Sequence, residues 1–187
     1  MLWYKKFKIS MPQDLKEVCK TYITQYEHEP LWSYKSVADS KMWTVPPLGP
    51  IGPDRIRFYD QVPGDTLKQF DEIGKIVTEV SGLELEEKSP VTVLWEYDKD
   101  FPHCPVHIDG GGEHTGSLIN PIVGNFKLHL HSKDEQDAPI IDTVDVDEST
   151  LLALNNTEFP HSVEGQGLLL VFGTDKKMKP QEYFADV

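Results

Sequence analysis

FPHCPVHID, residues 101–109, ends with a histidine and an aspartate two positions apart. On a β-strand, side chains at positions i and i+2 lie on the same face, so His107 and Asp109 can point at one centre. With 7 histidines and 31 acidic residues among 187, a His-x-acid tripeptide also arises by chance. The weight of this pair therefore depends on what the rest of the chain places around it.

A distant histidine completes a set of metal-ligand type. His161 lies in the segment FPHSV, residues 159–163. If its strand folds back beside the first segment, two imidazoles and one carboxylate occupy one side of a metal and leave the other positions open. This is the ligand set of non-haem Fe(II) oxygenases. Taken singly, each histidine is explained as a structural or surface residue and Asp109 as a turn residue, but the ordered set favours a metal site.

The C-terminal half has the pattern of successive β-strands. From Val91 onward, short apolar runs are separated mostly by turn residues. Eight strands are predicted, at 91–97, 104–109, 115–123, 126–131, 140–146, 151–154, 160–164 and 168–172.

Two amphipathic helices are predicted in the N-terminal half. Apolar residues recur at three- and four-residue steps from Asp14 to near His28, and again in a segment that opens at 63–65 and ends at 81–82, the spacing of helices with one buried stripe. Asp65 is expected to cap the second helix, and Gly82 to end it. Two helices followed by eight strands predict a mainly β fold with flanking α: a jelly roll (double-stranded β-helix, cupin-like) buttressed by the two N-terminal helices.

The rest of the N-terminal half is less regular. Residues 3–9 are β-like, and 55–59 also resemble a strand. Residues 29–62 form the least regular part, because prolines and glycines over 45–53 exclude regular structure. This stretch is interpreted either as a rigid surface loop or as a lid that covers a substrate.

The chain resembles the 2-oxoglutarate/Fe(II)-dependent oxygenases. The resemblance lies in the C-terminal half, in the order of His107-Ile108-Asp109, the segment 117–122 and His161-Ser162-Val163-Glu164. It implies a double-stranded β-helix in which His107, Asp109 and His161 hold Fe(II), with 2-oxoglutarate and O2 as co-substrates. It also implies hydroxylation of a peptide side chain or a small molecule.

The residue that binds the far carboxylate of 2-oxoglutarate departs from the family pattern. Many members carry an arginine or another basic residue shortly after the distal histidine, whereas residues 168–173 read LLLVFG here. A buried carboxylate needs a cationic partner. Some similar proteins use a lysine on the fourth core strand, which makes Lys127 the first candidate. Lys127 is equally well explained as part of an exposed face shared with His129 and His131.

Five other residues are candidates for the co-substrate pocket. Arg57 or Arg55, on the predicted N-terminal strand, could supply the cation instead of Lys127. Asn120 matches a position that lies near the co-substrate in similar proteins, although a turn-forming Asn-Pro step explains it as well. Trp95 and Tyr97 would line or underpin the pocket, or belong to the plain hydrophobic core.

Two alternatives concern the metal and its use. His103, Cys104 and His107 could bind zinc, but neighbouring side chains on a strand point to alternating faces and would not converge easily. The missing arginine favours a cupin-like metal-binding protein or enzyme that does not use 2-oxoglutarate. A non-catalytic binding module is a third possibility.

Composition limits the class of partner and the compartment. The net charge is −13 and arginine occurs only at positions 55 and 57, which argues against binding to duplex nucleic acid. The two cysteines do not indicate a disulfide framework, and no apolar run suits a signal peptide or a membrane span. We therefore expect a cytoplasmic protein that acts on a small molecule or a peptide, although residues 155–157 form a glycosylation sequon.

The length predicts a single domain over 1–187. Within it we expect a helical buttress and Pro/Gly-rich loop over 1–90, a jelly-roll core over 91–173 and a C-terminal tail over 174–187.

Overall fold

The structure is a computed structural model, and it describes residues 3–26, 41–46, 62–85, 92–109 and 116–174. Within these ranges the elements are, in chain order, β1 (Tyr4–Lys8), α1 (Gln13–Gln25), β2 (Lys41–Thr44), α3 (Gly64–Ser81), β3 (Val93–Tyr97), β4 (His103–His107), β5 (Ser117–His131), β6 (Ile140–Val146), β7 (Thr150–Leu154) and β8 (His161–Gly173).

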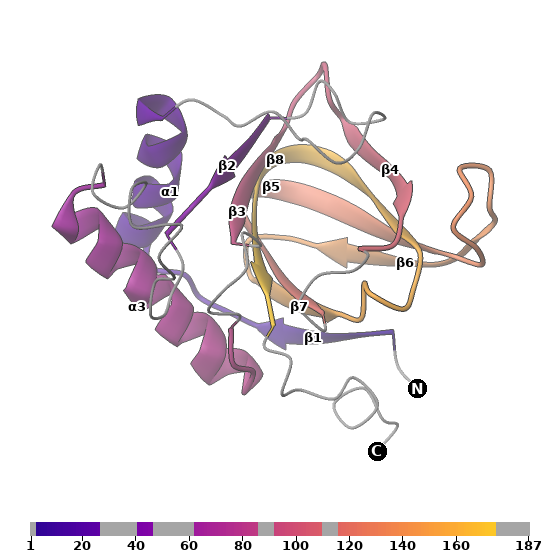
Figure 1. Cartoon of the computed structure of the whole chain (residues 1–187), viewed down its shortest axis with the longest axis horizontal. Helices are drawn as coiled ribbons and strands as arrows, with labels where there is room; N and C mark the ends of the chain where they lie inside the picture. The colour runs from indigo at the N-terminus through magenta and orange to yellow at the C-terminus, as the bar shows by residue number, and fades with distance from the viewer. Residues whose placement is uncertain (1–2, 27–40, 47–61, 86–91, 110–115, 175–187) are drawn as a thin grey trace.

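Two long strands, β5 and β8, connect two facing sheets. They pair antiparallel from Ser117 opposite Gly173 to Leu130 opposite His161. One half of this pair lies in a major sheet with the order β1-β7-β5-β8-β3-β2. The other half is flanked by β4 and β6 in a minor sheet. Figure 1 shows the resulting barrel with α1 and α3 on one side of it. This is a double-stranded β-helix with a helical buttress, so the predicted fold class is confirmed.

Glycines permit the bend at which β5 and β8 pass from one sheet to the other. Gly124 lies opposite Gly167, and both have positive φ angles, of 91° and 134°. A Cβ atom on Gly167 would overlap the carbonyl oxygen of Val123, and one on Gly124 would overlap that of Gln166. Only glycine combines these φ angles with so close a backbone approach.

A bulge in β5 decides which of its residues face the barrel interior. The register shifts between Pro121 and Val123. Ile119, before the bulge, and Phe126, after it, both belong to the interior core, although one is odd-numbered and the other even-numbered. One extra residue on a strand moves every following side chain to the opposite face. The predicted gap between 115–123 and 126–131 is therefore a bend and a bulge within one strand.

The major sheet separates two hydrophobic cores. On one face, Leu118, Leu170 and Phe172 pack with the buried stripes of the helices. In α1 this stripe is Leu15, Cys19 and Tyr22, which recur at helical spacing. The other face encloses the barrel interior, lined by Tyr97, Phe101, Cys104, Ile119, Phe126, Leu128, Leu130, Val144, Val146, Leu152, Leu154, Val163 and Leu169. Burial of a leucine or phenylalanine side chain contributes about 1.5–3 kcal/mol, so both cores contribute substantially.

The structure differs from the sequence prediction in three further details. The strand β2 was not predicted; it pairs with β3, and the indole nitrogen of Trp43 donates to the carbonyl oxygen of Tyr26 at 2.8 Å. Asp65 is not a cap: the cap position of α3 is Pro63, and no side chain caps it by a hydrogen bond. The predicted gap between 160–164 and 168–172 is absent, because β8 runs through it.

Some predictions lie outside the described residues. These are the strand at 55–59 and most of the Pro/Gly-rich stretch 45–53. The division into a single domain with three parts stays a prediction. In the described ranges, no helix combines the length and apolar character needed to span a membrane.

Replacing Gly167 with alanine should destabilise the fold by about 3 kcal/mol, because the added methyl group strains the backbone and meets a carbonyl oxygen. Gly64→Ala is the matched control, since a Cβ there meets no atom within 4 Å. It should raise stability by about 0.5 kcal/mol. Urea unfolding followed by circular dichroism measures both. Equal unfolding midpoints for Gly167→Ala and the unmodified protein would show that the bend tolerates a side chain.

Candidate metal centre

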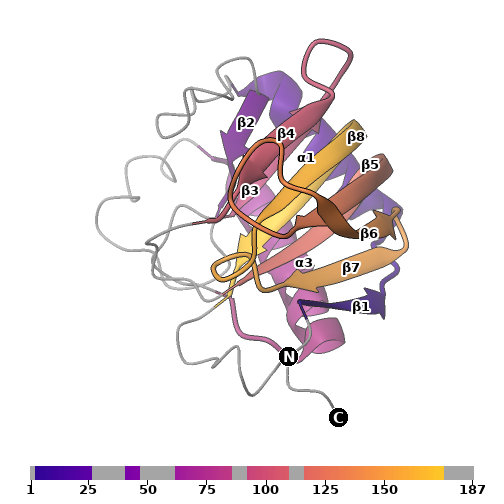
Figure 2. The ribbon, with the colours of Figure 1, turned by 90° about the vertical axis from the view of Figure 1, so that its right-hand side faces the viewer.

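Three predicted ligands, His107, Asp109 and His161, lie together at one end of the barrel. β4 lies beside β8 (Figure 2), and its register places His107 opposite His161. Asp109 follows β4 and lies 3.3 Å from Nε2 of His107 through Oδ1, and 3.8 Å from Nε2 of His161 through Oδ2. The potential ligand atoms all lie within 4.8 Å of one another. The structure thus brings together the three side chains singled out in the sequence.

Backbone carbonyls orient both imidazole rings. Nδ1 of His107 lies 2.8 Å from the carbonyl oxygen of Pro105, and Nδ1 of His161 lies 3.2 Å from that of Phe159. A carbonyl oxygen only accepts hydrogen bonds, so each Nδ1 carries a hydrogen and donates it. In the neutral ring, the lone pair is then on Nε2, which faces Asp109. This is the arrangement in which a second hydrogen bond prepares a histidine to bind a metal.

The two imidazoles differ in their affinity for a proton. Burial and the neighbouring His107 lower the pKa of His161 to about 4. Burial also acts to lower the pKa of His107, but hydrogen bonds to Asp109 and Cys104 outweigh it and raise the pKa to about 11. One ring is therefore protonated and the other neutral at pH 7. The cluster holds a single positive charge beside the carboxylate, at the place where a cation would bind.

Asn156 holds the carboxylate in place. It is buried between β7 and β8, and its side-chain nitrogen donates to Oδ2 of Asp109 and to Oγ of Ser117, the latter at 2.7 Å. The backbone carbonyl oxygen of Asn156 accepts a hydrogen bond from the backbone N–H of Asp109 at 3.0 Å. In the sequence, this residue stands out only as part of a glycosylation sequon. No local pattern indicated its role, because only the folded chain brings it to Asp109.

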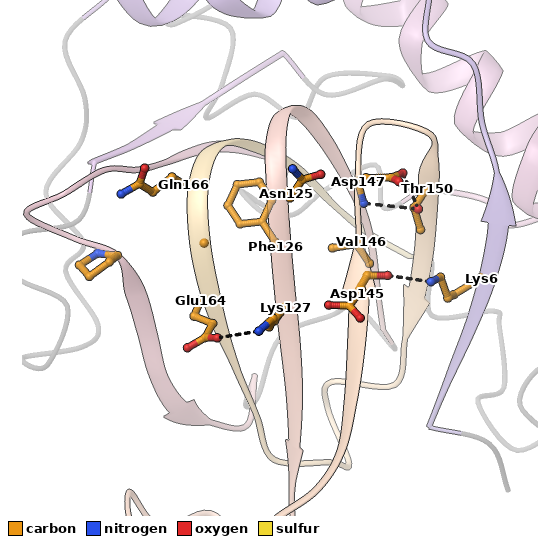
Figure 3. Close-up of a pocket in the computed structure, with 12 residues that line it drawn as sticks. Lys6, Asn125, Phe126, Lys127, Asp145, Val146, Asp147, Thr150, Glu164 and Gln166 are labelled. Atoms are coloured by element: carbon orange, nitrogen blue, oxygen red, sulfur yellow. Dashed lines mark hydrogen bonds and ion pairs between the residues drawn. The ribbon is translucent and has the colours of Figure 1, made fainter.

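Lys127 lies on the wrong face of β5 to serve the triad. Leu130 pairs with His161 and shares its inward face, so Lys127, three positions earlier, points outward. Its Nζ lies 3.9 Å from Oε1 of Glu164, and the two side chains are 56% and 50% exposed. Figure 3 shows this pair beside Asp145 in an outer groove of about 650 Å³. The predicted co-substrate role of Lys127 is therefore corrected.

Asn120 is likewise separated from the triad. It is fully buried and donates to the carbonyl oxygen of Thr150 at 2.9 Å. It lies two positions after Leu118, so the two side chains share one face of β5. Because Leu118 belongs to the core under the helices, the side chain of Asn120 also lies on the helix side of the major sheet. The predicted co-substrate role of Asn120 is therefore also corrected. The third candidate, Arg57, lies outside the described residues, as does Arg55.

The three residues of the alternative zinc site, His103, Cys104 and His107, do not converge on one point. His103 is exposed, whereas Cys104 is buried, so the two point to opposite faces of β4. Sγ of Cys104 lies 3.7 Å from Nδ1 of His107, but this nitrogen already donates to a backbone carbonyl.

Apolar side chains surround the candidate site. The interior residues of β5 beyond the bend are Phe126, Leu128 and Leu130, and Val163 faces them from β8. Within the described ranges, no lysine or arginine is buried. The described residues therefore supply the ligand set for a metal but no cation for the far carboxylate of 2-oxoglutarate.

Comparison with known proteins shows the fold. No family model matches the chain, and no curated protein matches its sequence. Among solved structures, the chain is similar to the crystal structure of a Pseudomonas putida prolyl-4-hydroxylase, with a TM-score of 0.53 and 14% sequence identity. The similarity covers 94% of each chain. At this identity it supports the double-stranded β-helix and leaves the activity to be argued from the site.

Asn156→Ala should weaken Fe(II) binding about tenfold, because Asp109 loses the amide that orients it. Anaerobic titration calorimetry measures the affinity. Asn120→Ala is the matched control: it also removes a buried amide, but on the helix side of the major sheet, so it should lower stability and leave Fe(II) affinity unchanged. Equal Fe(II) affinities of the two variants would contradict the positioning role of Asn156.

Fe(II) binding should strengthen with rising pH. The metal must displace the proton of His107, whose raised pKa keeps that ring charged through the neutral range. Affinity should rise about tenfold per pH unit between pH 6 and pH 8, with release of about one proton per ion bound. Titrations in buffers of different ionisation enthalpy count the protons. An affinity that does not vary with pH would show that no ligand is protonated in the metal-free protein.

Proposed function

We propose that this protein is a mononuclear non-haem Fe(II) oxygenase, which uses O2 to oxidise an organic substrate. The observation that carries the proposal is the convergence of His107, Asp109 and His161, with both Nε2 atoms turned toward the carboxylate. Two imidazoles and one carboxylate suit Fe(II) and leave coordination positions open for a substrate and O2. The fold shared with a prolyl-4-hydroxylase supports the same proposal.

Each residue of the site has a distinct part in this function. Bound Fe(II) would supply the redox chemistry that activates O2. His107 and His161 would hold it through Nε2, and Asn156 keeps Asp109 oriented toward it. The apolar interior side chains exclude water from the site, which strengthens electrostatic interactions there and limits side reactions.

The first candidate co-substrate is 2-oxoglutarate, which would be converted to succinate and CO2 as the substrate is hydroxylated. The family resemblance supports it. A peptide side chain is one candidate substrate, which the prolyl-4-hydroxylase neighbour supports, and a small molecule is the other. We place the protein in the cytoplasm as part of this proposal. Its net charge of −13 argues against duplex nucleic acid as a partner.

A second candidate function uses the same metal without 2-oxoglutarate. Its substrate would bind the metal directly, as in cupin-like enzymes. The observation that favours it is the lack of a buried lysine or arginine in the described ranges, since an unpaired buried carboxylate is costly.

Anaerobic titration of the protein with Fe(II) and then 2-oxoglutarate distinguishes the two candidates. A visible charge-transfer band on addition of the oxo acid supports the first candidate. Bound iron without any such band supports the second.

Asp109→Ala should weaken Fe(II) binding by more than about 100-fold, because the site loses the one carboxylate that the described residues place in it. Lys127→Ala is the control, since this side chain points to the outer groove, and its Fe(II) affinity should equal that of the unmodified protein. Titration calorimetry compares the three proteins. Unchanged affinity in Asp109→Ala would remove the basis of the proposed function.

A further inference from the structure

The indole nitrogen of Trp95 is a buried donor without an acceptor. Trp95 lies on β3 opposite Leu169, an interior residue, so its ring belongs to the barrel side of the major sheet. Its centroid lies 5.7 Å from that of Tyr97 and 6.2 Å from that of Phe101. Nε1 has no contact with solvent and no hydrogen-bond partner.

An unpaired buried N–H group needs an explanation. Burial removes the hydrogen bond that water would make, and folded proteins pair nearly all such groups. Trp95 as a whole is only partly buried, whereas its Nε1 atom is fully enclosed, so the missing hydrogen bond cannot be made by bulk solvent in this conformation. For comparison, the buried indole of Trp43, outside the barrel, donates to a backbone carbonyl oxygen at 2.8 Å. The lack of a partner is therefore particular to the position of Trp95.

A continuous series of side chains connects Trp95 with the candidate metal centre. The Tyr97 ring packs against Trp95, and its hydroxyl interacts with the thiol of Cys104. Sγ of Cys104 in turn lies 3.7 Å from Nδ1 of His107. Trp95 and the triad therefore face the same interior. A ligand that binds the metal at one end could reach the indole at the other.

We infer that the barrel interior binds a ligand with an apolar body and an uncharged hydrogen-bond acceptor, such as an ester, amide or hydroxyl oxygen, that receives the N–H of Trp95. The inference rests on the proposed metal centre, which takes the chelating end of the ligand. The unpaired indole N–H is neutral and cannot offset the cost of burying a second carboxylate, and none of the described residues supplies a buried lysine or arginine, so a neutral acceptor suits it better. The site thus selects against a dicarboxylate and in favour of a 2-oxo acid with a neutral far end.

Two probes that differ only at this far end test the inference: 2-oxoglutarate and its 5-methyl ester. Both are titrated anaerobically into the Fe(II)-loaded protein, after a separate titration with Fe(II) alone. The unmodified protein should bind the ester at least about tenfold more tightly than the dicarboxylate, because only the dicarboxylate buries an unpaired charge. The Nε1–H resonance of Trp95, identified by its loss in Trp95→Phe, should shift when the ester binds.

Two conservative variants isolate the indole donor. Trp95→Phe keeps an aromatic ring and removes the N–H, so ester affinity should fall about fivefold to tenfold while Fe(II) affinity is unchanged. Trp43→Phe is the matched control, since its indole lies outside the barrel, and its ester affinity should match that of the unmodified protein.

Four outcomes would overturn the inference. These are tighter binding of 2-oxoglutarate than of its ester, undiminished ester affinity in Trp95→Phe, an ester-bound protein with an unshifted Trp95 resonance, and failure of both compounds to bind an Fe(II)-loaded protein. The titration with Fe(II) alone separates these outcomes from failure of the proposed function. If the unmodified protein does not bind Fe(II), the metal centre itself is refuted and the inference falls with it.

Discussion

The pairing of β5 with β8 along their whole length is the constraint on which the rest of the structure depends. Each strand contributes to both sheets, so this pair holds the barrel together. The two backbones stay in register through a sharp bend because Gly124 and Gly167 lie opposite one another there. The same register leaves His161 at the start of β8, where β4 brings His107 beside it. Backbone geometry at the bend thus determines where the imidazoles meet.

The major sheet has one face that packs against the helices and one face that encloses the proposed metal site. Its helix-facing side is filled by the stripes of α1 and α3, and a fully buried amide such as Asn120 serves the backbone there. Its barrel-facing side leads to the triad. On these strands, two residues that are two positions apart face the same side of the sheet, whereas two adjacent residues face opposite sides. Lys127 illustrates this, since Leu128 points inward and Lys127 points into the outer groove.

Among the residues that the structure describes, charge in the barrel interior is confined to the candidate metal centre. Asp109 is balanced by the proton of His107, and Asn156 holds its orientation. Beyond this cluster, the described interior offers mainly aliphatic and aromatic surface, in which the indole N–H of Trp95 is a donor without a partner. A metal suits the first region because it brings positive charge to a carboxylate. The second region suits uncharged groups, and this difference limits which co-substrate can occupy the interior.

Local sequence pattern was enough for much of the fold. The eight predicted strands correspond to the strand segments of the double-stranded β-helix, and the two helices lie within a few residues of their predicted bounds. Periodicity succeeds because strand and helix geometry relate a residue to neighbours two to four positions away. The spacing of His107 and Asp109 indicated a shared site for the same reason. His161 was added because two imidazoles and a carboxylate form a metal-ligand set, and the family resemblance agreed, but no local spacing could connect it to the other two.

Other features were decided only by the tertiary structure. The bulge in β5 reverses which residues face inward, so Lys127 could not be placed from alternation alone. Asn156 reaches Asp109 from a turn far along the chain, and nothing near it in sequence indicates the contact. The sequence by itself determined the elements, their order and the pair of adjacent ligands. Which face each element buries, and which distant side chain supports the site, depended on contacts between residues that only folding brings together.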